Sequence, residues 1–244
     1  MPGQFFGLVG ESGSGKTTLV RAILRAIEPS SGSVLFQGND GAVDLCQLTH
    51  KQLMPLRTQM QMIFQDPFAS LNPRMKVADI IAEPLVIHHP EQHLQHRQQV
   101  IKMLERVGLE ADSLHRFPHA FSGGQRQRIG IARALILNPS LVICDEAVSA
   151  LDVSVQAQVL NLLADLQEEM NLTYIFVAHD LNVVHHFCER ALVMYRGAVV
   201  ESGPVDQIFT SPQHDYTKLL LSAIPSLDPD IKLAPLDRNS LDLG

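Results

Sequence analysis

Tryptophan is absent from the chain, and aromatic residues make up only 5% of its 244 residues. Basic residues are also outnumbered, since 19 Lys and Arg stand against 26 Asp and Glu and give a net charge of −7. Proteins that bind nucleic acid use basic surfaces, and those that bind single strands add aromatic rings on which bases stack. Both shortages argue against a nucleic acid partner.

Cysteine is equally scarce, and long apolar runs are missing. The three cysteines, Cys46, Cys144 and Cys188, are far apart and lack metal-ligand spacing, so we expect neither a disulfide framework nor a zinc site, which suits a reducing cytosol. No apolar run reaches the roughly 18 residues of a membrane-spanning helix, and no basic region precedes the first short apolar run. We therefore expect no signal peptide, and any membrane role to be peripheral.

The sequence pattern predicts an α/β fold. Residues 5–9 form an apolar run that precedes a glycine-rich loop and a helical pattern over 16–27. Other expected strands span 33–37, 60–64, 141–144, 173–177 and 191–194, with a hairpin arm at 198–201. Expected helices span 77–88, 93–107, 124–137, 153–170 and 181–187, and two short ones follow residue 203. Alternating strands and helices imply a largely parallel sheet whose ligand lies at the carboxyl ends of its strands.

A helical lobe interrupts this pattern after the turn-rich segment that follows Gln65. We expect an α/β lobe of residues 1–67 and 139–210, a helical subdomain of 68–138, and C-terminal helices and tail over 211–244. With 45% hydrophobic residues, the chain is large enough for one catalytic unit with a sizeable core.

The glycine-rich loop carries the strongest chemical signal. It reads Gly10, Glu11, Ser12, Gly13, Ser14, Gly15, Lys16, Thr17, and Thr18 follows it. This is the pattern G-x-x-x-x-G-K-[ST], in which backbone N–H groups surround phosphates, the lysine reaches the β and γ phosphates and the hydroxyl ligates Mg²⁺. The loop predicts a nucleoside triphosphate site.

Phosphoryl transfer also needs a carboxylate for Mg²⁺ and a group that orients water. Asp145 and Glu146 follow the expected strand 141–144, so Asp145 is the candidate metal ligand and Glu146 the candidate base. An acidic pair after a strand is otherwise a common helix cap, and the upstream phosphate loop favours the catalytic interpretation.

Three further features have two interpretations each. Ser122, Gly123, Gly124 and Gln125 open a helix, either as an ordinary cap or as a second anion-binding terminus, and spacing alone leaves open whether they meet the same phosphate. Gln65 and His179 end expected strands, either as satisfied polar residues or as ligand contacts. The histidines of 88–96 include His89, His93 and His96 at helical spacing, but Pro90 interrupts the turn, so we favour a solvated helix face over a metal site.

The order of these motifs resembles that of the ABC ATPase family. The matching segments are GESGSGKT, IFQDP with Gln65, FSGGQRQR, LVICDE, SALD ending at Asp152, and AHD with His179. The segments between them are most similar to ATPases of dipeptide, oligopeptide and nickel importers. The likeness covers roughly residues 4–225 and implies a P-loop NTPase core with an inserted helical subdomain.

The resemblance implies an ATPase that uses ATP and Mg²⁺ and works as a head-to-tail dimer. Residues 122–125 of one copy would complete the phosphate site around Lys16 of the other, Asp152 would couple the sites, and His179 would contact the γ-phosphate. Gln65 would bind Mg²⁺ and connect the site to a groove where a permease helix docks. The resemblance places the chain on the cytoplasmic face of the membrane, with a substrate-binding protein as an indirect partner.

Three departures from the family stand out. Ala147 replaces the usual proline after the catalytic glutamate, which would loosen the base and lower activity. The family's adenine-stacking aromatic lies well upstream of the phosphate loop, whereas Phe5 and Phe6 lie within the loop's own strand, so we expect this clamp and the N-terminal strands to be missing. The tail has no cysteine, so we expect no iron–sulfur centre of the kind some relatives carry.

Rival interpretations share the catalytic motifs. An ABC exporter ATPase would differ only in the amino-acid sequence of the segments between the motifs. A soluble ABC protein would be expected to show tandem cassettes or a long coiled-coil insert. A non-catalytic nucleotide-binding regulator is disfavoured by the presence of Glu146 and His179.

Overall fold

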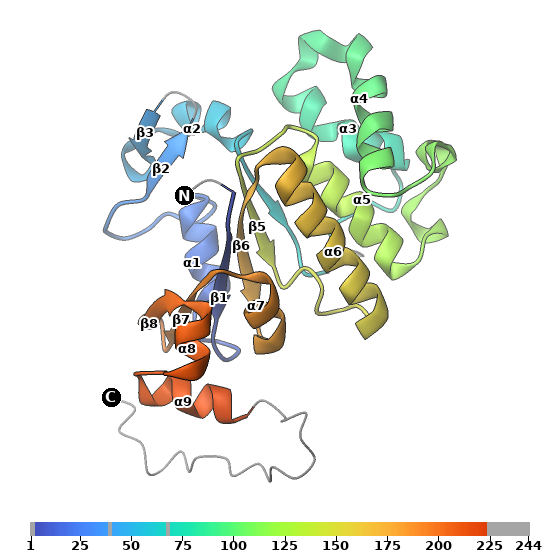
Figure 1. Ribbon diagram of the computed structural model, residues 1–244. Helices are drawn as coiled ribbons and strands as arrows, with labels where there is room; N and C mark the ends of the chain where they lie inside the picture. The colour runs from blue at the N-terminus through green and yellow to red at the C-terminus, as the bar shows by residue number, and fades with distance from the viewer. Residues whose placement is uncertain (1–2, 39–40, 67–68, 224–244) are drawn as a thin grey trace.

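The central element is a six-stranded sheet. The computed structural model describes residues 3–38, 41–66 and 69–223 of the chain (Figure 1). The strands lie in the order β4 (Met60–Ile63), β5 (Leu141–Asp145), β6 (Thr173–Ala178), β1 (Phe5–Val9), β7 (Arg190–Tyr195) and β8 (Ala198–Pro204). Neighbouring strands are parallel except β8, which runs antiparallel to β7. The parallel sheet expected from the sequence is confirmed.

Helices cover both faces of this sheet. Because strand side chains alternate between faces, Ile143 packs with Val20 of α1 (Lys16–Ile23), whereas Val142 belongs to the cluster that includes Val159 of α6 (Val153–Met170). Helix α7 (Leu181–Phe187) follows β6 and packs on β1 and β6 (Figure 1). The result is a three-layer α/β arrangement.

The segment between β4 and β5 is helical, as expected. It contains α3 (Val77–His88), α4 (His93–Arg106) and α5 (Gly123–Leu135), which pack on one another at one end of the molecule (Figure 1). This segment also contains short 3-10 helices at Pro90–Gln92, Ala111–His115 and Pro118–Ala120, and another, at Leu45–Gln47, precedes β4. Buried Ile80 and Leu104 of the helical segment belong to the same apolar cluster as Leu163 of α6, so the two lobes share a core.

The segment from residue 35 to 57 departs from the sequence analysis. Strand β2 (Leu35–Gly38) pairs with β3 (Gly41–Asp44) in a separate two-stranded sheet, and α2 (His50–Arg57) follows. Neither β3 nor α2 was expected, because α2 is polar and contains Pro55. The capping box between Thr49 and Gln52 was a usable signal for its start. Helix α1 also ends earlier than expected, at Ile23.

The histidine segment differs from the sequence prediction, whereas the C-terminal helices agree with it. A solvated face is wrong for His96, which is 5% exposed and whose Nε2 lies 3.1 Å from the carbonyl oxygen of His89. The two short C-terminal helices are confirmed as α8 (Val205–Thr210) and α9 (Asp215–Ser222). The remainder of the tail lies outside the described residues. Within the described part of the chain, no helix combines the length and apolarity needed to cross a bilayer.

Packing of α7 against the sheet depends on a glycine. A Cβ added to Gly7 of β1 would lie 2.5 Å from Cγ1 of Val184. We therefore expect Gly7→Ala to lower the free energy of unfolding by about 1–3 kcal/mol, measured by urea denaturation.

Gly130 of α5 provides a control of opposite sign, because an added Cβ there meets no atom within 4 Å. Gly130→Ala should raise the free energy of unfolding by about 0.4–1 kcal/mol, since alanine favours the helix. Equal effects of the two substitutions would contradict the packing explanation.

Candidate functional site

The glycine loop connects the carboxyl end of β1 to the start of α1. Gly10 has φ 152°, and a Cβ there would lie 2.2 Å from the carbonyl oxygen of Met194 in β7. Gly15 caps α1 with φ 99°, in the left-handed region. The loop therefore takes a course along β7 that requires glycine at both positions.

Lys16 lies beneath this loop and is 5% exposed. Its Nζ donates hydrogen bonds to the carbonyl oxygens of Gly10 at 2.7 Å and Glu11 at 2.9 Å. Burial lowers the pKa of Lys16, and the nearby carboxylates of Glu146 and Asp145 oppose that shift. Because an ammonium has three donors, one remains to bind a phosphate oxygen.

Thr17 and Asp145 bring two oxygen ligands together. The Thr17 hydroxyl donates to Oδ1 of Asp145 at 3.1 Å, although the residues are 128 positions apart in the sequence. Burial raises the pKa of Asp145, while the hydrogen bond from Thr17 lowers it. Hydroxyl and carboxylate oxygens are the ligands that Mg²⁺ prefers, so the donor set fits this ion.

Glu146 is held at the centre of the site. Its backbone is left-handed, with φ 49°, a conformation that is strained by about 1–3 kcal/mol in a residue other than glycine. Its N–H donates to the carbonyl oxygen of Val177 at 3.0 Å, and its own carbonyl oxygen accepts hydrogen bonds from both the N–H and the hydroxyl of Ser149. These contacts hold the backbone of Glu146, and the next residue, Ala147, is buried in the core.

Two strand ends converge on the Glu146 carboxylate. Gln65, after β4, donates from Nε2 to Oε2 of Glu146 at 2.8 Å. Nδ1 of His179, after β6, lies 3.5 Å from the same oxygen. The structure thus unites side chains that the sequence could only place at separate strand ends.

Ser122 and Asp152 both cap helices, and both are exposed. Ser122 accepts from the N–H of Gln125 at 3.3 Å, and Gln125 accepts in return from the N–H of Ser122. Asp152 accepts from the N–H of Val155 at 3.0 Å and from the Ser154 hydroxyl. Among the described residues, none of these bonds reaches the glycine loop.

Gly123 and Gly124 have different surroundings. A Cβ at Gly124 would lie 2.4 Å from Cγ1 of Val155, so this glycine lets α5 approach α6, whereas one at Gly123 would make ordinary contact with Leu151 at 3.6 Å. Packing against α6 therefore explains why position 124 is glycine, but it does not explain the glycine at position 123.

The remaining residues of the glycine loop differ in exposure. Ser12, Gly13 and Thr18 are exposed, while Ser14 is buried and its hydroxyl has no partner among the described residues.

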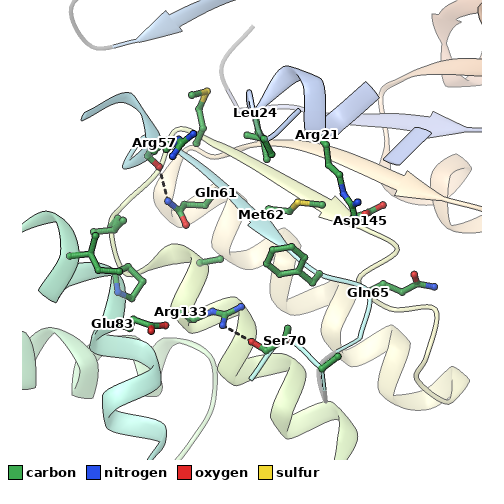
Figure 2. A pocket seen from close by; sticks show the side chains of 18 of the residues that line it. Arg21, Leu24, Arg57, Gln61, Met62, Gln65, Ser70, Glu83, Arg133 and Asp145 are labelled. Carbon is green, nitrogen blue, oxygen red and sulfur yellow. Dashed lines mark hydrogen bonds between the residues drawn. The ribbon is translucent and has the colours of Figure 1, made fainter. Parts of the chain in front are cut away.

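A groove of about 970 Å³ runs from this site along the helical lobe. Figure 2 shows Gln65 and Asp145 on one side and Glu83 of α3 on the other. Arg133 of α5 lies between them and donates to the carbonyl oxygen of Ser70 at 2.6 Å (Figure 2). The groove and the site therefore share two polar side chains.

Residues 1–149 match the family model for ABC transporters. This match spans more than half of the chain. The chain belongs to the ABC transporter family. Residues 200–243 match a second model, the oligopeptide/dipeptide transporter C-terminal region.

Named relatives of this ABC protein are peptide transport proteins. It is 53% identical over 231 residues to the oligopeptide transport ATP-binding protein OppF of Salmonella typhimurium, covering 94% of this chain and 68% of that one. It is 54% identical over 229 residues to OppF of Bacillus subtilis, covering 93% and 74%.

Solved ABC structures share the fold. One is cbiO1 from Clostridium perfringens, part of the transporter complex cbiONQ, with a TM-score of 0.74 and 29% identity over 86% of this chain and 80% of that one. Another is a dimeric ATP-binding cassette in a post-hydrolysis state with ADP and Pi, with a TM-score of 0.72 and 29% identity over 84% and 87%. The expected family and P-loop NTPase fold are confirmed.

Some residues at the ABC site were missed by the sequence analysis. The carbonyl oxygen of Met194 packs on Gly10, and the N–H of Gly197 donates to the carbonyl oxygen of Ser14 at 3.0 Å. Their only sequence signal is their place at the end of a strand. Phe5 is buried and stacks on Tyr174 with ring centroids 4.9 Å apart, so its ring is part of the core.

Burial of Asp145 has a consequence for stability. Its pKa is raised above the unfolded value, so stability is lost as the pH rises through the interval between the two values. Asp145→Asn removes the buried charge and keeps an oxygen that can accept from Thr17. We expect the nucleotide-free variant to unfold at a higher urea concentration at pH 7.

Asp152→Asn is the matched control. The Val155 N–H and the Ser154 hydroxyl lower the pKa of Asp152, so its charge stabilises the fold above its unfolded pKa. This variant should unfold at a lower urea concentration at pH 7. A decrease for Asp145→Asn as well would show that burial does not dominate at Asp145.

Proposed function

We propose that this chain is the ATP-hydrolysing subunit of an importer for oligopeptides or dipeptides. The observation that carries the proposal is the convergence of Lys16, Thr17, Asp145 and Glu146 in a chain whose C-terminal region matches peptide transporters. Residues 1–67 and 139–210 form the α/β lobe of a single ABC ATPase domain, residues 68–138 its helical subdomain, and residues 211–244 its C-terminal part.

Each residue of the site has a role in hydrolysis. The Lys16 ammonium and backbone N–H groups of the glycine loop and of the start of α1 bind the phosphates of ATP, apart from the N–H groups of Glu11 and Ser14, which donate to the Tyr216 hydroxyl and the Glu11 carbonyl oxygen. Thr17, Asp145 and Gln65 would hold Mg²⁺, which would supply positive charge to offset the charge of the phosphates. Glu146 accepts a proton from the attacking water, so that ATP and water give ADP and phosphate. Gln65 and His179 position the Glu146 carboxylate, and His179 also contacts the γ-phosphate.

A second cassette completes the site. At the start of α5, Ser122 and Gln125 are exposed and Gly123 is half-buried, so backbone N–H groups at this positive end of the helix can meet a second copy of the chain. In a head-to-tail dimer these donors bind the γ-phosphate held by Lys16 of the partner copy, and Asp152 couples the two sites. The similar dimeric cassette solved with ADP and Pi supports this arrangement.

The groove beside the helical lobe receives a cytoplasmic helix of a membrane-embedded permease subunit. Its lining includes exposed Phe64 and Ile87 besides Gln65 and Asp145, so an apolar docking surface adjoins the hydrolytic site. The chain then lies on the cytoplasmic face of the membrane. A substrate-binding protein contacts the permease rather than this chain and selects the transported compound.

The exporter alternative is less well supported. Exporter ATPases share the catalytic motifs, whereas residues 200–243 match the C-terminal region of oligopeptide and dipeptide transporters. The identity of about half of all aligned residues with two OppF proteins favours peptide import.

Glu146→Gln should stop hydrolysis and leave ATP binding intact. The amide cannot accept the water proton, whereas Lys16, Thr17 and Asp145 still hold Mg·ATP. We expect the rate of phosphate release to fall by about 10²- to 10⁴-fold and nucleotide-sandwiched dimers to accumulate.

Asp180→Asn is a suitable control, because asparagine also caps α7 through the N–H of residue 182. Its rate should stay close to that of the parent. Hydrolysis by Glu146→Gln at the parent rate would rule out Glu146 as the base.

Ser122→Arg should abolish activity without unfolding the monomer. A bulky cation at the start of α5 opposes the helix dipole and blocks the partner's γ-phosphate. Mixing this variant with Lys16→Ala should restore one composite site per heterodimer, made from the intact Lys16 of one chain and the intact Ser122 of the other. If demonstrated heterodimers show no ATPase activity, the sites are not shared between chains.

A further inference from the structure

A tyrosine of the last described helix contacts the backbone of the glycine loop. The N–H of Glu11, the second residue of the loop, donates to the hydroxyl oxygen of Tyr216 in α9 at 2.9 Å. The two residues are 205 positions apart in the sequence. Tyr216 is 1% exposed, so its hydroxyl is placed by packing.

Tyr216 and the start of α9 are held in place by several contacts with neighbouring residues. The Tyr216 ring lies on that of Tyr195, with centroids 4.2 Å apart, and the N–H of Tyr216 donates to Nδ1 of His214 at 3.1 Å. The carboxylate of Glu201 in β8 accepts hydrogen bonds from the N–H groups of Gln213 and His214 at 2.9 and 3.0 Å. Helix α9 is thus tied to the β7–β8 hairpin.

The same hairpin holds the other end of the loop. Gly197, in the turn between β7 and β8, donates to the carbonyl oxygen of Ser14 at 3.0 Å. The hairpin and α9 therefore form a single C-terminal support, joined by the contact between the Tyr195 and Tyr216 rings, whose planes are inclined by 31°. This support contacts the glycine loop at its second and fifth residues.

We propose that Tyr216 is a positioning residue that holds the glycine loop in its phosphate-binding conformation. The inference rests on the proposed function in one respect, that this loop binds nucleotide. A loop fixed in advance loses less conformational freedom on binding, so the tether raises affinity. Because the Tyr216 hydroxyl accepts from the backbone of the loop, we expect it to affect the binding of ATP and ADP alike and to leave the chemical step unchanged.

The test compares Tyr216→Phe with Tyr195→Phe in the full chain. Each substitution removes one hydroxyl from the same ring pair, and the Tyr195 hydroxyl has no hydrogen-bond partner among the described residues. We expect Tyr216→Phe to raise the Kd for both Mg·ATP and Mg·ADP by about 3- to 10-fold, as loss of one hydrogen bond does. It should also raise KM by the same factor, with kcat within about twofold of the parent. Tyr195→Phe should leave all four quantities within about twofold.

Amide hydrogen exchange at Glu11 in the unaltered chain gives a readout that does not depend on whether the variant folds. In the unaltered nucleotide-free chain the Glu11 amide should exchange slowly, and in Tyr216→Phe faster. Exchange at the rate of an unprotected amide in the unaltered chain overturns the proposal. So do equal nucleotide affinities of the two variants, or a fall in kcat without a change in Kd. Failure of the unaltered chain to bind nucleotide would instead overturn the proposed function.

Discussion

The buried ammonium of Lys16 needs hydrogen-bond acceptors and negative charge around it, and the geometry of the site follows from supplying them. Backbone carbonyl oxygens provide the acceptors, and two nearby carboxylates provide the charge. Burial disfavours its charge, and Glu146 and Asp145 oppose that effect without removing it. The carbonyl oxygens of Gly10 and Glu11 supply the remaining partners at 2.7 and 2.9 Å. Gly10, which supplies one of these carbonyls, has φ 152° and lies so close to β7 that an added Cβ would be 2.2 Å from the carbonyl oxygen of Met194. Binding a triphosphate thus requires β1, β5 and β7 to lie in fixed relation.

The strand order β4-β5-β6-β1-β7 meets that requirement. Parallel strands present their carboxyl ends at one edge of a sheet, so the residues following each strand converge there. Gln65 follows β4, Glu146 follows β5, His179 follows β6 and the glycine loop follows β1. Segments that are remote in the sequence therefore meet within hydrogen-bonding distance, and the left-handed backbone of Glu146 is strain retained at the point of convergence.

Periodicity predicted most elements because their burial is regular, and motif spacing predicted the residues that converge on Lys16. The sequence did not predict elements or residue roles that depend on contacts between segments far apart in the chain. Residues 41–57 lack a regular apolar period, with Pro55 inside a helix, and β3 pairs with β2. Gly124 looked like part of an anion site, yet its contact with Val155 gives it a packing role that no local pattern could reveal. The bond between Glu11 and Tyr216 joins residues 205 positions apart, with no sequence signal.

Two remote regions hold opposite sides of the nucleotide site. The C-terminal hairpin and α9 contact the glycine loop, through Gly197 and Tyr216. The segment after β4 contacts the candidate catalytic residue Glu146, since Gln65 lines the groove and donates to the Glu146 carboxylate. A displacement of the helical lobe would therefore move Gln65 relative to Glu146 while the phosphate loop stays fixed to the sheet. Because Gln65 is both a candidate Mg²⁺ ligand and a hydrogen-bond partner of Glu146, such a displacement would alter metal binding together with the placement of the Glu146 carboxylate.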